Sequence, residues 1–217
     1  MKKRIKICLI IISIIASITL IVVYMQNKYL FVKSDIQTKQ VIGVIDGKLS
    51  NYNDIITKSN IKDYTNDEIT HGDQILNFVK EICNAKVAYY DASDVLGKVE
   101  TEQIILGLEW MKKNHIKYVN ISLSSNKYDK DLDDWISENK NDVIVFASYN
   151  NIANSFDYPA MYEDVIGSGI DSNIVKKDND VLYSSNNIII NYNFNKNYQG
   201  NSYLSMISLL DFIEMSK

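Results

Sequence analysis

The sequence predicts an α/β protein whose central sheet is mostly parallel. Short, nearly unbroken apolar segments recur between residues 41 and 170, as expected for strands that are buried on both faces. Segments with apolar residues at helical spacing separate them, and strands that alternate with helices form parallel sheets covered on both faces. Hydrophobic residues make up 46% of the 217, which is enough for a packed core and argues against a disordered chain.

The N-terminal segment has a different character. The stretch "MKKRIK" (1–6) carries four basic residues, and the next nineteen residues (7–25) carry no charge. An apolar helix of that length just crosses the hydrocarbon core of a bilayer. No small-residue cleavage site follows, so we expect an uncleaved transmembrane anchor with the basic head in the cytoplasm and the domain outside the cell membrane. A cleaved signal peptide, which would release a secreted protein, is the second possibility.

The domain begins after a short connection. Residues 26–40 are expected to form a juxtamembrane linker, and residues 41–217 one compact domain. The run "VIGVID" (41–46) is apolar up to its final charge, which predicts a buried first strand. A polar, irregular stretch (47–70) separates it from a helix that begins near His71. The apolar residues of that helix share one face: Ile75, Leu76, Val79 and Ile82.

The alternation continues to the end of the chain. Apolar runs predict strands, and helical spacing predicts one helix with an apolar side formed by Ile104, Ile105, Leu108 and Met111 and another with Leu132, Trp135 and Ile136 facing inward. The expected order is a strand over 85–92, a helix over 98–115, a strand over 117–125, a helix over 129–140, strands over 142–151 and 164–170, and a strongly apolar helix over 201–215.

Charge and cysteine content exclude several classes of function. The net charge is −4 although four basic residues stand at the head, so the remainder of the chain is acidic and shows no basic cluster for nucleic acid. Cys8 lies inside the apolar segment and cannot plausibly pair with Cys83 in the domain. Cys83 has no His or Cys neighbours at metal-ligand spacing. We therefore expect no nucleic-acid partner, no disulfide and no cofactor.

Four residues with catalytic side chains stand at the ends of expected elements. Asp46 ends the first strand, and His71 begins a helix. Asn150 follows a strand, and Ser202 stands at the head of the last helix. Sites in α/β sheets form at the carboxyl ends of strands and at helix N-termini. A serine hydrolase needs a hydroxyl, an imidazole base, a carboxylate that orients the base, and a donor for the oxyanion.

The order Asp, His, Ser along the chain is that of subtilisin, and six segments resemble the subtilisin-like serine peptidases (subtilases, peptidase family S8). "VIGVIDGKL" resembles the Asp motif of the family, and "THGDQILNFV" resembles its His motif. "LEWMKKNHIKYVNISLS" resembles the helix and strand that end in N-x-S-L-G, and "VIVFASYNN" resembles the segment with the oxyanion Asn. "YPAMYEDVIGSGID" and "GNSYLSMIS" resemble the Y-P-A segment and the nucleophile motif. The six segments keep the order of the family and cover most of residues 41–210.

The resemblance implies a three-layer subtilisin-like fold and a role for each matching residue. Asp46 would orient the base, His71 would be the base, and Ser202 the nucleophile. The side-chain amide of Asn150 would bind the oxyanion together with the backbone N–H of Ser202. The segment Ser122, Leu123 and Ser124 would line the substrate cleft, where an extended peptide can pair with its backbone. The resemblance also implies a cis peptide bond between Tyr158 and Pro159.

The chain departs from the family pattern at several of these motifs. Asp73 replaces a Thr two residues after His71, and its carboxylate could either raise the pKa of the imidazole or cap the helix, which we consider the better explanation. Gly47 follows Asp46 directly, without the usual Thr or Ser. Other replacements lie beside the cleft and the nucleophile: Ser124, Tyr149, Met206, Tyr203 and Leu204. No loop matches the calcium sites of the family, so we expect no metal.

The sequence therefore favours a membrane-anchored serine endopeptidase that faces outward and cleaves a peptide or protein substrate through an acyl-enzyme at Ser202. The departures near the cleft leave a second hypothesis, a catalytically impaired pseudoprotease that binds a peptide or a protein partner. A third hypothesis, an unrelated α/β binding or structural protein, would make the six ordered segments coincidental.

Overall fold

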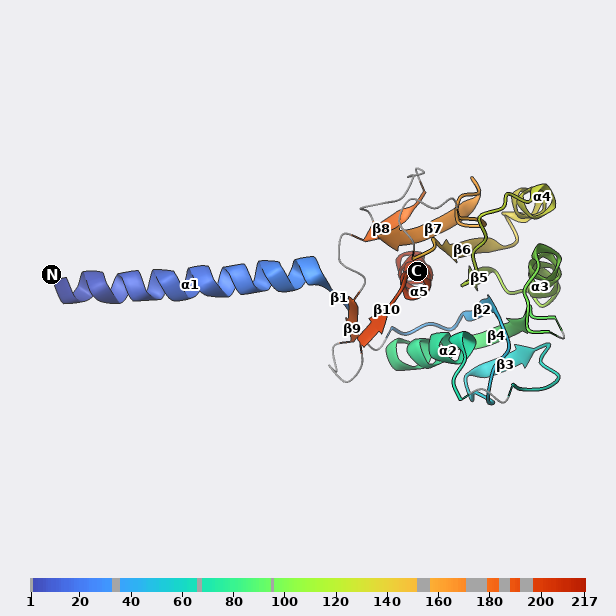
Figure 1. Ribbon diagram of the computed structural model, residues 1–217, viewed down its shortest axis with the longest axis horizontal. Helices are drawn as coiled ribbons and strands as arrows, with labels where there is room; N and C mark the ends of the chain where they lie inside the picture. The colour runs from blue at the N-terminus through green and yellow to red at the C-terminus, as the bar shows by residue number, and fades with distance from the viewer. Residues whose placement is uncertain are drawn as a thin grey trace.

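The computed structural model describes residues 2–32, 36–65, 68–94, 96–151, 157–170, 179–183, 188–191 and 197–217. A long N-terminal helix projects from a compact α/β body (Figure 1). The helices are α1 (Lys2–Lys28), α2 (His71–Ile82), α3 (Thr101–Lys113), α4 (Lys130–Asn139) and α5 (Asn201–Met215). The strands are β1 (Tyr29–Val32), β2 (Val41–Asp46), β3 (Ile56–Ser59), β4 (Lys86–Asp91), β5 (Tyr118–Ile121), β6 (Ile144–Ser148), β7 (Val165–Ile170), β8 (Val181–Tyr183), β9 (Ile188–Asn191) and β10 (Asn197–Gln199).

The main sheet has seven strands in the order β3-β4-β2-β5-β6-β7-β8. Every neighbouring pair is parallel, which confirms the prediction of a mostly parallel sheet. All carboxyl ends of the strands therefore meet at one edge of the sheet. Asp46 pairs with Asp91 at that edge, so the first strand ends level with its neighbour.

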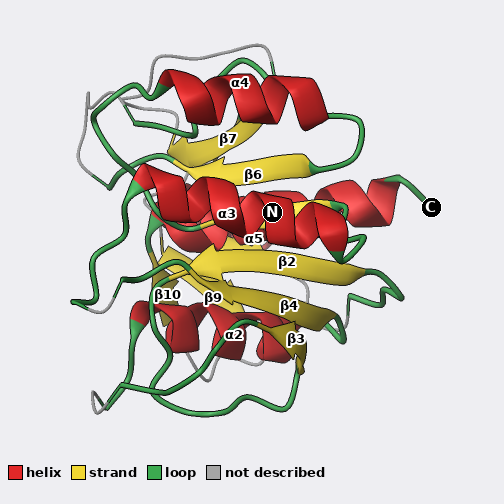
Figure 2. Ribbon diagram, turned by 90° about the vertical axis from the view of Figure 1, so that its right-hand side faces the viewer, coloured by secondary structure: helices red, strands yellow, loops and turns green. Residues whose placement is uncertain are grey.

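Helices cover the sheet on both faces, as the alternating pattern predicted (Figure 2). Side chains of successive residues in β2 point to opposite faces, because a strand has a period of two. Val44 belongs to the core that β2 shares with α2 and α5, whereas Ile45 belongs to the core shared with α3 and α4. The two cores and the sheet between them form the three layers that the family resemblance implied.

Helix α5 is the most deeply buried of the described helices and lies against β5, β6 and β7. Its buried side chains surround the helix axis rather than forming one stripe, which is typical of a helix inside a core. They include Leu204, Met206, Leu209 and Leu210. The bulkier residues that replace the family pattern at positions 203, 204 and 206 are all accommodated in this core.

A second, three-stranded sheet joins the N-terminal stretch to the segment before α5. β1 pairs in parallel with β9, and β10 pairs antiparallel with β9. The expected linker over 26–40 therefore contributes a strand, and Val32 at its end is buried. Ile36 is buried as well, and its N–H donates a 3.0 Å hydrogen bond to the carbonyl of Ile82.

The segment expected to be a transmembrane anchor, 7–25, lies within α1. Among the described residues, the structure contains no helix with both the length and the apolar character that a membrane crossing requires.

Two further expectations can be compared with the structure. The Tyr158–Pro159 peptide bond is cis, which confirms the implication of the Y-P-A segment. The stretch 47–70, expected to be irregular, contains the edge strand β3, whose side chains are mostly exposed. A strand with so little apolar burial leaves no periodic signal in the sequence.

Candidate active site

Asp46 and His71, which are 25 residues apart in sequence, are joined by a hydrogen bond. Asp46 is buried at the carboxyl end of β2, and its Oδ2 lies 2.8 Å from Nδ1 of His71. Its Oδ1 accepts the N–H of Gly47 at 2.7 Å, which fixes the orientation of the carboxylate. A carboxylate in this position favours the tautomer protonated at Nδ1, so Nε2 is left as the basic nitrogen.

The imidazole of His71 contacts a buried carboxylate on one side and is accessible to solvent on the other. Its side chain is 46% exposed, whereas that of Asp46 is 2% exposed, so the ring extends from the buried carboxylate to solvent. The hydrogen bond that His71 donates to Asp46 raises the pKa of His71 above its ordinary value of 6.5, and partial desolvation opposes that effect. A histidine that a carboxylate orients while its other ring nitrogen stays accessible meets the requirements of a general base.

Helix α2 begins at His71 because of a capping box formed by its neighbours. The Thr70 hydroxyl accepts the N–H of Asp73, and the Asp73 carboxylate accepts the N–H of Thr70 at 2.8 Å. The same carboxylate accepts the Ser50 hydroxyl at 2.6 Å. Although burial acts to raise the pKa of Asp73, these hydrogen bonds from Ser50 and Thr70 lower it overall. Asp73 therefore caps the helix, and the cause of the raised pKa of His71 is Asp46.

The glycine after His71 is explained by a tyrosine that the sequence did not single out. The Tyr89 hydroxyl donates a 2.5 Å hydrogen bond to the carbonyl of Gly47. A Cβ on Gly72 would lie 2.1 Å from that hydroxyl oxygen, so no larger residue fits there without a shift of Tyr89. Burial, together with the nearby carboxylate of Asp46, holds the pKa of Tyr89 well above its ordinary value, so it stays a neutral donor.

Ser202 faces the same cavity as the Asp46–His71 pair. It is the second residue of α5 and is half-buried, and the helix is preceded by Gly200 at a φ of 132°, which favours glycine. The cavity has a volume of about 390 Å³ and is lined by Asp46, Gly47, His71, Gly97, Val99, Ser122, Leu123, Ser124, Ser148, Tyr149, Asn150, Asn151 and Ser202. The Ser202 hydroxyl makes no hydrogen bond to any described residue.

Asn150 follows β6 and lines this cavity, with its backbone held on both sides. Its N–H donates to Oδ2 of Asp157 at 2.9 Å, and its carbonyl accepts Nδ2 of Asn201 at 2.8 Å. Asp157 and Asn201 are both buried. The structure thus brings Asn150 together with Asp46, His71 and Ser202.

The segment Ser122–Ser124 lies beyond the end of β5 and also lines the cavity. The hydroxyl of buried Ser122 accepts Nδ2 of Asn120 at 2.6 Å, and Oδ1 of Asn120 accepts the Ser205 hydroxyl at 2.7 Å. This buried chain of hydrogen bonds ties the cleft segment to α5, three residues after Ser202. Sequence reasoning missed Asn120 and Ser205, whose only signal was their place in segments already quoted.

A second cavity of about 410 Å³ adjoins the first, because Val99, Leu123 and Ser124 line both. Its wall combines aliphatic and aromatic side chains with polar and charged ones: Ile104, Leu132, Tyr128, Tyr158 and Tyr162 stand beside Glu100, Lys127 and Asp129. The rings of the three tyrosines contact one another, with centroids 5.0 to 5.7 Å apart. The cavity is suited to one side chain of a ligand that lies along 122–124.

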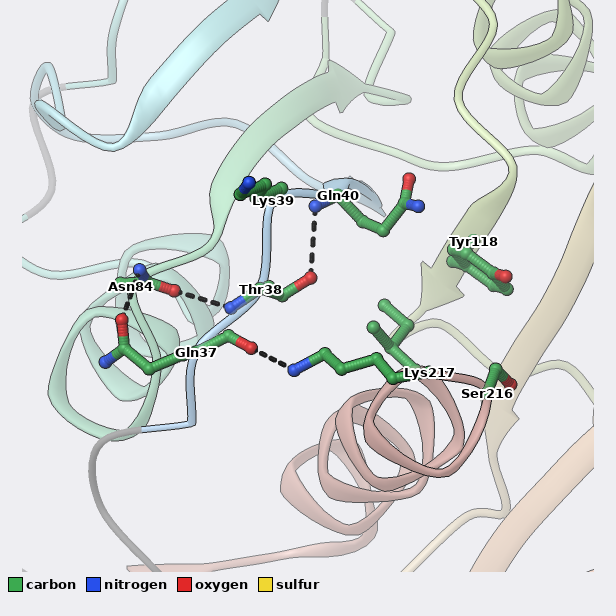
Figure 3. A pocket seen from close by; sticks show the side chains of 9 residues that line it. Gln37, Thr38, Lys39, Gln40, Asn84, Tyr118, Ser216 and Lys217 are labelled. Carbon is green, nitrogen blue, oxygen red and sulfur yellow. Dashed lines mark hydrogen bonds between the residues drawn. The ribbon is translucent and has the colours of Figure 1, made fainter.

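A third cavity, of about 450 Å³, lies away from these residues, where residues 37–40 pass the C-terminal end of α5 (Figure 3). Hydrogen bonds from Thr38 to Asn84 and from Lys217 to Gln37 hold its rim. None of the candidate catalytic residues contributes to it. Within the described part of the chain, no three His, Cys, Asp or Glu side chains are grouped to ligate a metal.

The overall fold of this chain is similar to that of solved structures. One similar solved structure is a cold-adapted subtilisin-like serine proteinase, with a TM-score of 0.59 and 15% identity over 85% of this chain and 78% of that one. Another is the psychrophilic subtilisin-like protease Apa1 from the Antarctic psychrotroph Pseudoalteromonas sp. AS-11, with a TM-score of 0.50 and 16% identity over 59% of this chain. This chain spans about a third (35%) of the length of Apa1. No protein-family model matches the sequence, and no curated protein matches it. The fold is therefore subtilisin-like.

Proposed function

We propose that this protein is a serine endopeptidase that cleaves peptide or protein substrates through an acyl-enzyme. The observation that carries the proposal is the 2.8 Å contact between Asp46 and His71 beside a cavity that Ser202 and Asn150 also line. A subtilisin-like fold alone would not imply activity, because one fold hosts many functions. The side chains at the carboxyl edge of the sheet supply the chemistry that the fold does not.

The proposed reaction assigns one step to each group. Nε2 of His71 takes the proton of the Ser202 hydroxyl as the oxygen attacks the substrate carbonyl, and Asp46 stabilises the imidazolium that forms. The side-chain amide of Asn150 and the backbone N–H of Ser202 donate to the oxyanion. His71 then gives its proton to the leaving amine, and the acyl-enzyme is hydrolysed when His71 activates a water molecule.

The substrate is proposed to lie along Ser122–Ser124 as an extended strand. These residues continue beyond β5, and a peptide laid beside them would add backbone hydrogen bonds. One of its side chains would enter the adjoining cavity, whose wall contains Tyr128, Tyr158 and Tyr162. We therefore expect the cleavage rate to depend on which residue the peptide carries at one position before the cleaved bond.

A second candidate function, a peptide-binding pseudoprotease, is favoured by one observation. The Ser202 hydroxyl makes no hydrogen bond to a described residue, His71 included. Such contacts are commonly long in the absence of substrate and tighten in the complex, so the missing hydrogen bond does not outweigh the Asp46–His71 pair.

Outward-facing membrane attachment through residues 7–25 stays a prediction from the sequence. Extraction with alkaline carbonate tests it, because a membrane-anchored chain should remain in the membrane pellet.

Hydrolysis of fluorogenic peptides by the full chain separates the two functions. Ser202→Ala and His71→Ala are each expected to lower the rate at least about a thousandfold, since triad residues act as a unit. Ser216→Ala, an exposed serine near the end of the same helix, is the matched control and should keep wild-type activity. Folded wild-type protein that binds peptides without cleaving them would favour the pseudoprotease.

A further inference from the structure

Asn201, the residue before the candidate nucleophile, joins two segments that the sequence separates by fifty residues. Its Nδ2 donates to the carbonyl of Asn150 at 2.8 Å. Its backbone N–H donates to Oδ1 of Asn151, also at 2.8 Å. The side chain of Asn201 is buried, whereas Asn151 is exposed, and both hydrogen bonds are partly buried. Asn201 thus donates both of the hydrogen bonds that join the start of α5 to the loop after β6, and we call this pair of bonds the Asn201 clasp.

This clasp replaces the usual cap of the helix. The N-cap of α5 is Gly200, which has no side chain to accept the N–H groups of the first turn. Asn151 supplies an acceptor from another part of the chain. Asn201 uses its backbone N–H to bind Asn151 and its side chain to bind Asn150. The position of the first turn of α5 and the position of Asn150 therefore depend on each other.

The two segments joined in this way carry the two candidate oxyanion donors. One is the side-chain amide of Asn150, and the other is the backbone N–H of Ser202. An oxyanion hole works only when its donors lie at about 2.7–3.1 Å from the oxyanion, and an error of about 1 Å can cost about a hundredfold in rate. The carboxylate of Asp157 holds the N–H of Asn150, so Asn201 completes the constraint on the other side of that residue.

We propose that Asn201 is a positioning residue of the oxyanion hole, acting on the tetrahedral intermediate through Asn150 and through the backbone of Ser202 without touching the substrate. The inference rests on the proposed peptidase function and deepens it. Oδ1 of Asn201 is buried and accepts no hydrogen bond from a described residue, so in this part of the chain Nδ2 alone holds the side chain. Loss of that donor should remove this constraint on the carbonyl of Asn150.

The test compares variants of the full chain by their rate of acylation with an activated ester, by kcat and KM for a peptide, and by Tm. Asn201→Ala removes the donor, and Asn201→Asp keeps the shape but places an oxygen against the carbonyl of Asn150. Both are expected to slow acylation by about tenfold to a hundredfold, mainly in kcat. Asn114→Ala is the matched control, because it removes a similar 2.9 Å bond from an Asn amide to the Trp110 carbonyl, far from the site.

A double-mutant cycle then asks whether Asn201 acts through Asn150. In an Asn150→Ala background, Asn201→Ala should cost much less than it does alone, because the group that it positions is missing. If the Asn201 variants do not fold, Asn151→Ala and Asn151→Asp decide the question, since Asp retains the acceptor for the N–H of Asn201 and should restore acylation that Ala loses.

The outcomes that overturn the inference are distinct from those that overturn the function. Wild-type acylation rates in the Asn201 variants, or equal losses with and without Asn150, would show that the clasp is only structural. A loss of acylation rate that only parallels the loss of Tm, with the same relation in Asn114→Ala, would also show that the clasp is only structural. Folded wild-type protein that is never acylated would overturn the proposed function and this inference together.

Discussion

Removal of the Asp73 carboxylate tests whether this departure from the family pattern serves the helix or the histidine. Asp73→Ala deletes the acceptor for the Thr70 N–H, the Thr70 hydroxyl and the Ser50 hydroxyl, at 2.8, 2.7 and 2.6 Å. Loss of a helix cap costs about 1 kcal/mol, and loss of a buried hydrogen bond to a charged group costs about 1.5–3 kcal/mol. Because these contributions overlap at one carboxylate, we expect about 2–4 kcal/mol of destabilisation at pH 7. Urea denaturation followed by circular dichroism measures it.

The pH dependence of that difference has a definite sign. The pKa of folded Asp73 is lowered from the ordinary value of 3.8, so its contribution to stability is fully present above that value. The contribution is lost as the pH falls through the pKa of the folded state. Wild type and Asp73→Ala should therefore differ at neutral pH and converge in acid. Their difference should not depend on pH between 6 and 8.

The same variant should leave the imidazole unchanged. A titration of His71 by NMR should give the same pKa in Asp73→Ala as in wild type, because Asp46 is the group that raises it. A marked fall of the His71 pKa without a loss of stability would refute this reasoning. It would mean that the Asp73 carboxylate acts on the base rather than on the start of the helix.

Two further predictions concern the neighbours of His71. Asp46→Asn should lower the pKa of His71, because the carboxylate that stabilises the imidazolium is gone while desolvation remains; it should also lower kcat about ten-thousandfold, and an unchanged NMR titration would contradict the assignment. Gly72→Ala should destabilise the protein by about 1–3 kcal/mol through overpacking, because the new methyl group would lie 2.1 Å from the Tyr89 hydroxyl oxygen. Adding Tyr89→Phe should recover part of that loss in thermal denaturation, and a purely additive double variant would contradict the clash.

The sequence predicted helices and strands best where a short pattern of apolar residues belongs to a buried element. The apolar run 41–46 and the helical face that begins at His71 are strand β2 and helix α2 of the structure. Asp46 and His71 could be placed at one edge of the sheet because parallel strands all end there. Strand ends were less certain: the run 117–125 predicted a longer strand than β5, which ends at Ile121 before the cleft segment.

Long-range pairing had no local signal. The stretch 26–40 was expected to be a linker, yet β1 within it pairs with β9, about 160 residues later. The four residues of β1 are too few, and lack the alternation of apolar and polar residues, to indicate which strand they pair with. The Asn201 clasp was missed for a related reason, since its two acceptors, on Asn150 and Asn151, lie in the loop after β6, about fifty residues earlier in the chain.

The central claim is that Ser202 is a nucleophile activated by the Asp46–His71 pair, and a fluorophosphonate adduct mapped by mass spectrometry tests it most directly. We predict one adduct per chain, located on the peptide that contains Ser202, and formed at least about a hundredfold more slowly in His71→Ala. Ser202→Ala should remain unmodified. Folded wild-type protein that acquires no adduct, or an adduct that persists at another residue in Ser202→Ala, would contradict the account.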